Sequence, residues 1–82
     1  MTQNDEKCLK AIKLALNNDW DGAHKIVQEL NSSSAQLIHA VLHKIEGDES
    51  NSRYWYNRVG GSYEEFKNPI EELNSIQNDL NV

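Results

Sequence analysis

The chain has 82 residues, of which 38% are hydrophobic and 26% charged, so it can bury one small core but not two. A formal net charge of −5 argues against the basic surface that nucleic-acid binding requires. No apolar run exceeds three residues and the N-terminus is polar, so we expect neither a membrane span nor a secretory signal. The single cysteine, Cys8, cannot form an internal disulfide, which suits a reducing cytoplasm.

The first half of the chain predicts two helices. Apolar residues recur at a four-residue spacing from about residue 4 to residue 16, as on one face of a helix. A turn rich in asparagine follows, and Asp19 is the predicted N-cap of a second helix from Trp20 to about Leu30. We expect these two helices to form a first antiparallel hairpin, about residues 4–30.

A second hairpin is expected at about residues 35–60. Ser33 or Ser34 would cap a helix over about 35–46, and Gly47 would end it. A further helix would start after Ser50 and end at Gly60 in a left-handed cap. The predicted buried residues are Leu37, Ile38, Val41, Leu42 and Ile45 on the first of these helices and Ser52, Trp55, Tyr56 and Val59 on the second, with Trp55 largely buried.

The last predicted helix covers about residues 69–80. Asn68 and Pro69 are typical of an N-cap and a first helical position, and Glu71 and Glu72 favour a solvated helix N-terminus. Its expected apolar stripe is Ile70, Leu73, Ile76 and Leu80. No segment alternates with period two, so the predicted fold is a single all-α domain, residues 1–82, of two consecutive hairpins plus a C-terminal capping helix.

A weak internal repeat relates the two hairpins at a spacing of 29 residues. It aligns Ala23 with Ser52 and Val27 with Tyr56. In tetratricopeptide repeats, which are about 34 residues long, an alanine precedes an aromatic residue by this same spacing. The predicted architecture is therefore similar to tetratricopeptide-type hairpins, although only Ser52 and Tyr56 give a fair version of their sequence pattern.

A second resemblance covers residues 18–61. The segments WDGAH at 20–24, LIHAVLHKIEGD at 37–48 and NSRYWYNRVG at 51–60 carry it. Together they resemble a family of small, mostly bacterial, uncharacterised helical proteins with the pattern W-x-x-A-H, I-H-A-x-L-H-x-x-E-G-D and N-x-x-Y-W-Y-x-R-x-G. Ser52 and Val59 stand where that family more usually has alanine. The resemblance implies a helical fold and a set of residues, but no mechanism.

Three histidines are the main candidates for chemistry. On a helical wheel His39, His43 and Glu46 lie together beside the apolar arc of their helix. Imidazole and carboxylate suit zinc, iron or manganese, and imidazole also supports proton transfer near neutral pH. His24 is the one histidine on another predicted helix, at the rim of its apolar stripe. Two other interpretations remain: histidines hydrogen-bonded within the structure, or a polar ligand pocket.

Tyr54 and Arg58 are four residues apart and point away from the predicted core, so they should lie side by side. Such a pair suits a recognition surface, or else Tyr54 packs under a neighbouring helix and Arg58 pairs with an acid. We expect a small cytoplasmic binding module with a groove between the helices at 35–46 and 51–59, needing no cofactor and binding a protein or a small anionic ligand. The candidate binding residues are His24, His39, His43, Tyr54 and Arg58. The alternative is a metal-binding protein or enzyme centred on His24, His39 and His43 and using a divalent metal.

Overall fold

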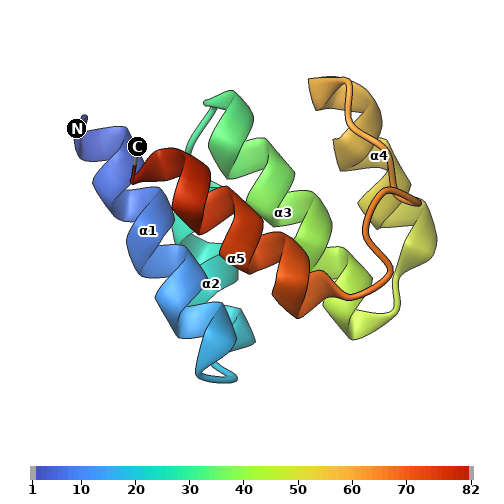
Figure 1. Ribbon diagram of the computed structural model, residues 1–82, viewed down its shortest axis with the longest axis horizontal. Helices are drawn as coiled ribbons and strands as arrows, with labels where there is room; N and C mark the ends of the chain where they lie inside the picture. The colour runs from blue at the N-terminus through green and yellow to red at the C-terminus, as the bar shows by residue number, and fades with distance from the viewer. Residues whose placement is uncertain (1, 82) are drawn as a thin grey trace.

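The computed structural model describes residues 2–81, and in that range it is all-helical, without strands. The five helices are α1 (Gln3–Leu16), α2 (Trp20–Val27), α3 (Ser33–Glu46), α4 (Glu49–Val59) and α5 (Pro69–Leu80). Helix α1 packs mainly on α2 and helix α3 mainly on α4, while α5 lies across α1 and α3 (Figure 1). None of these helices is long and apolar enough to cross a membrane.

Each helix begins at a polar side chain that accepts a hydrogen bond from a backbone N–H of the first turn. Asp19 and Asn68 serve helices α2 and α5, as expected, and Asp48 serves α4, which therefore begins at Glu49 rather than after Ser50. The cap of α3 was predicted wrongly. Ser32, rather than Ser33 or Ser34, accepts from the N–H of Ala35 at 3.2 Å, so α3 begins two residues earlier than expected.

Glycines occupy the two left-handed helix ends that the sequence predicts. Gly47 has φ 84° and Gly60 has φ 74°, a region that a residue with a Cβ seldom adopts. Gly22 has a different reason to be glycine. A Cβ there would lie 2.5 Å from Oδ2 of Asp19, so the missing side chain leaves room for the capping carboxylate.

Helix α2 ends at Val27 rather than near Leu30 as predicted. The N–H of Leu30 donates to the carbonyl of Val27 at 3.1 Å, which tightens the chain into a turn. Leu30 is half-buried against the core. Because α2 is short, the chain reaches Ser32, the N-cap of α3, within a few residues of the end of α2.

Helix α3 is the centre of the domain because it contacts all four other helices. Six consecutive residues, 38–43, are buried in it, including His39 and His43, which are 6% and 8% exposed. The histidines expected to line a groove are therefore covered, because neighbouring helices pack against α3 on every side there. Ile45, predicted to be buried, lies beyond that cover and is 38% exposed.

The buried faces of α4 and α5 differ in part from the expected ones. Ser52 and Tyr56 are buried, and the Ser52 hydroxyl donates to the Ala40 carbonyl at 2.7 Å. Trp55, expected to be largely buried, is only half-buried. On α5, Leu73 and Ile76 are buried as predicted, whereas Ile70 and Glu72 are reversed: Ile70 is 43% exposed and Glu72 only 4% exposed. These two residues are two apart on a helix, so they face in nearly opposite directions.

Candidate metal centre

Three histidine side chains from two helices meet beside the core. His24 comes from α2, and His39 and His43 come from successive turns of α3. One ring nitrogen of each lies within 4.8 Å of those of the other two. The nearest pair is Nε2 of His24 and Nε2 of His39, 3.1 Å apart. The structure thus brings together the three histidines that the sequence places on two predicted helices.

Trp20 holds the α2 side of this cluster. Its indole N–H donates to the carbonyl of Leu42 at 2.7 Å, which ties the first turn of α2 to α3. Trp20 is one helical turn before His24, and the two rings stack with centroids 4.7 Å apart and planes 11° apart. The orientation of His24 is therefore set by a side chain that is itself fixed to α3.

Trp55 holds the α4 side. Its indole stacks on the His39 imidazole with a centroid distance of 4.1 Å and an interplanar angle of 16°. The half-buried position of Trp55 follows from this contact, because one ring face covers His39. The Arg58 guanidinium lies 5.4 Å from the Trp55 ring centroid. Trp20 from α2 and Trp55 from α4 thus cover the rings of His24 and His39.

Glu46 stands behind His43. Its Oε1 lies 2.6 Å from Nδ1 of His43, where it accepts the N–H of that ring. This contact fixes the tautomer and leaves the lone pair of His43 on Nε2, as a carboxylate does behind a metal-bound histidine. His24 provides the third imidazole of the cluster. A second group of possible ligand atoms, from His43, Glu46 and Asp48, also falls within 4.8 Å but shares His43 with the first.

Two of the cluster's histidines, His24 and His39, favour the neutral form. Burial, and after it the neighbouring His24 and His43, whose positive forms would repel a positive His39, together lower the pKa of His39 to about 4. The pKa of His24 is lowered as well, first by burial and then by His43, although Glu46 and Asp21 oppose this change. Neutral imidazole is the form that binds a metal.

The same groups also satisfy one another by hydrogen bonding. With one ring as donor, the 3.1 Å contact between His24 and His39 is an N–H···N hydrogen bond. Across the described residues, no buried side-chain nitrogen or oxygen is left without a partner. A metal shared by the three imidazoles would therefore replace the hydrogen bond between His24 and His39.

Tyr54 and Arg58 lie apart from the histidines. Arg58 donates to the Tyr54 hydroxyl at 3.3 Å, so the predicted side-by-side pair is present. Within residues 2–81, no hydrogen bond or ring contact joins either residue to a histidine, and Trp55 lies between them and His39. The pockets beside α3 and α4 open around residues 61–67 rather than at the imidazoles. The expected single groove with all five residues is therefore divided.

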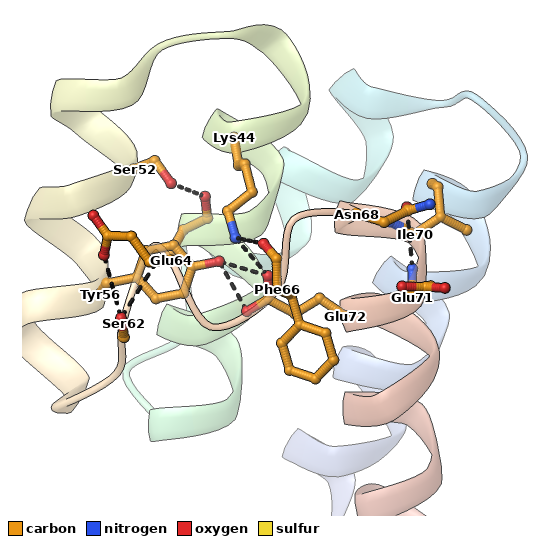
Figure 2. A network of polar contacts seen from close by, with 11 residues as sticks. Lys44, Ser52, Tyr56, Ser62, Glu64, Phe66, Asn68, Ile70, Glu71 and Glu72 are labelled. Atoms are coloured by element: carbon orange, nitrogen blue, oxygen red, sulfur yellow. Dashed lines mark hydrogen bonds and ion pairs between the residues drawn. The ribbon is translucent and has the colours of Figure 1, made fainter.

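Sequence reasoning missed a second buried polar group, formed by Lys44, Tyr56 and Glu72 (Figure 2). The Lys44 ammonium donates to Oε1 of Glu72 at 2.8 Å and to the Phe66 carbonyl at 3.0 Å. The Tyr56 hydroxyl lies 2.7 and 2.8 Å from the two Glu72 oxygens. Burial, and then this carboxylate, raise the pKa of Tyr56, so it remains a neutral donor.

A signal for this network was present in the sequence. On the helical wheel, Lys44 falls at the edge of the apolar arc of its helix, beside Leu37. A lysine there requires a buried acid as partner, and Glu72 supplies it. The expectation that Glu72 is a solvated N-terminal acid is therefore wrong. No protein-family model, curated protein or solved structure matches this chain.

Proposed function

We propose that this protein binds a divalent transition metal, zinc first among them, through His24, His39 and His43. The observation that carries the proposal is the convergence of three imidazole nitrogens from two helices within 4.8 Å. In a tetrahedral zinc site with Zn–N bonds of about 2.0–2.1 Å, neighbouring ligand nitrogens are about 3.3–3.4 Å apart. The 3.1 Å between Nε2 of His24 and Nε2 of His39 is close to that separation.

The surroundings of the histidines support the same function. The carboxylate of Glu46 accepts from Nδ1 of His43, which is the arrangement that orients a metal-binding imidazole. Stacked tryptophans hold the rings of His24 and His39. Burial keeps His39 unprotonated at neutral pH, so no proton has to leave it when the metal binds. Little rearrangement of the chain is required.

The proposed centre is of the open kind. Three protein ligands leave the fourth zinc position for water or an external molecule, whereas structural zinc sites take all four ligands from the protein. A zinc ion held by these residues would lower the pKa of a water in that position toward neutrality, which would make the centre capable of hydrolytic chemistry. Metal binding is the function we propose, and catalysis at the fourth position is its natural extension.

Calorimetric titration of tag-free protein with Zn²⁺ and Co²⁺ tests this function. We expect one metal per chain, and loss of binding in His24→Gln and in His39→Gln. Gln28→Ala is the matched control, since this exposed residue at the end of α2 should leave the affinity unchanged. Stoichiometric zinc that produces no saturable heat, or equal binding by all three variants, would contradict the proposal.

A second proposed function is recognition of a protein partner by the outer face of α4. The observation that favours it is Tyr54, a 51% exposed aromatic side chain that contacts Arg58. Tyrosine and arginine are enriched among the residues that dominate binding energy at interfaces. A photo-crosslinker in place of Tyr54 should trap such a partner, and Arg58→Ala should abolish the trapping. A crosslinker in place of Asn74, exposed on α5, is the control.

The arrangement of the five helices as hairpins is also proposed. We infer two consecutive antiparallel hairpins of the tetratricopeptide-like kind, α1–α2 and α3–α4, with α5 as the capping helix. The close packing within each pair and the short turns between its helices support this description. The proposed location is the cytoplasm, where the buried free thiol of Cys8 would remain reduced.

A further inference from the structure

A pocket of about 410 Å³ opens between α1 and the C-terminal part of α2. This volume falls within the range of small-molecule sites. The pocket is lined by Lys7, Lys10, Lys25, Ile26, Glu29 and Leu30, and we refer to it as the lysine pocket. It shares no lining residue with the histidine cluster, so nothing in the argument below depends on metal binding.

Positive charge is concentrated in the lysine pocket. Three of the chain's eight lysine and arginine residues line it, although the whole protein carries a net charge of −5. Lys7 and Lys10 are one turn apart on α1, where two like charges repel each other. Over residues 2–81 no carboxylate comes within 4.0 Å of these three ammonium groups, whereas Lys44 and Arg53 both have ion-pair partners.

The pocket also has an apolar side. Ile26 and Leu30 are half-buried, with part of each side chain packed against the core and part lining the pocket. Glu29 is the one acid in the lining. A ligand that fits must therefore neutralise two or three cations and also cover aliphatic surface. Inorganic ions meet only the first requirement.

We propose that the lysine pocket binds a small organic anion, one phosphate or dicarboxylate group attached to an apolar or aromatic body. The anionic group contacts the ammonium groups of Lys7, Lys10 and Lys25, and the body covers Ile26 and Leu30. A phosphate can belong to a soluble compound or to a lipid headgroup. The volume of the pocket matches a small molecule, so the soluble compound is the ligand assigned here.

The test is an amide NMR titration of the full chain with phenyl phosphate and, separately, with inorganic phosphate. We expect shifts centred on residues 7–10 and 25–30, with phenyl phosphate binding about threefold more tightly or better because its ring covers apolar surface. The triple variant Lys7→Gln, Lys10→Gln, Lys25→Gln should weaken phenyl phosphate binding about tenfold or more. Thermal melting establishes that the variant is folded.

The matched control removes the same charge elsewhere. The triple variant Lys13→Gln, Arg53→Gln, Lys67→Gln has the same net charge but an intact lysine pocket, and it should bind phenyl phosphate like the parent chain. Equal loss in both triple variants, equal affinity for the two phosphates, or shifts outside the pocket would each overturn the proposal. So would binding to phosphatidic acid vesicles, measured by sedimentation, without binding to phenyl phosphate.

Discussion

Two buried polar clusters flank α3, and they are built on opposite principles. In one, the positive Lys44 meets the negative Glu72, and Tyr56 donates to the same carboxylate. In the other, three imidazoles meet, and burial keeps His39 neutral because no counter-charge lies against it. The first cluster is complete, since each charge has its opposite. The second retains nitrogen lone pairs and little charge, so it can still accept a cation. This difference is the basis of our proposal that the second cluster binds a metal, whereas the first holds the fold together.

The largest effect should come from breaking the ion pair. Glu72→Gln leaves the Lys44 ammonium buried without a counter-charge, so we expect unfolding to become easier by about 3–5 kcal/mol. Chemical denaturation measures the change. Glu71→Gln, the exposed neighbour on α5, is the control and should stay within about 0.5 kcal/mol of the parent. Similar stabilities for the two variants would mean that Glu72 does not hold α5 in place.

Acid should destabilise the histidine cluster. The pKa of His39 is about 4 in the fold against an ordinary value of 6.5, so the unfolded chain binds more protons between these values. The stability that the fold has while His39 is neutral is therefore fully present above pH 6.5. It is lost as pH falls toward 4, and the free energy of unfolding decreases by about 3 kcal/mol in all. Denaturation of the metal-free protein in EDTA between pH 7 and pH 5 should show this slope. If the stability of His39→Gln depends on pH as steeply as that of the parent chain, His39 is not the cause of the dependence.

Removing the stacking partner should have a smaller effect. Trp55 is half-buried and covers one face of His39, so Trp55→Ala should lower the free energy of unfolding by about 2–3 kcal/mol. Tyr54→Ala removes a more exposed ring from the same helix and should cost less than about 1 kcal/mol. Melting curves of both variants give the comparison, and a smaller loss from Trp55→Ala than from Tyr54→Ala would contradict it.

The smallest effect concerns the carboxylate behind His43. Glu46→Gln weakens the hydrogen bond at Nδ1 and should reduce zinc affinity about tenfold with almost no change in stability. Glu49→Gln is the matched control, because Glu49 is exposed and pairs with Arg53 instead. Calorimetric titration of both variants with Zn²⁺ measures the difference. Equal zinc affinities would show that Glu46 does not support the proposed centre.

Local features of this fold could be predicted from the sequence because their causes are local. Asp19, Asp48 and Asn68 cap helices through bonds to residues at most three positions away, and Gly47 and Gly60 end helices through their own φ angles. Lys44 and Glu72 could not be paired in this way, since they are 28 residues apart and meet only after α5 folds back.

The residues of the candidate site could be predicted from the sequence, but their burial could not. The residue types and the spacing of His39 and His43 pointed to a metal or a proton-transfer site, and His24 was the evident third member. A wheel of α3 placed the histidines outside its apolar arc and so suggested exposure. Their burial depends on Trp20 and Trp55, which arrive from α2 and α4. The residue pattern of one helix does not show which side chains from other helices will cover it.

The central claim is that the three imidazoles share one cation. Long-range ¹H–¹⁵N spectra of the histidine rings in tag-free protein, recorded with and without one equivalent of Zn²⁺, test it most directly. We predict that one nitrogen of each of His24, His39 and His43 shifts together and saturates at one zinc per chain, with Nε2 as the nitrogen that shifts on His43. Ring spectra that remain unchanged, with the hydrogen bond between His24 and His39 intact, would contradict it.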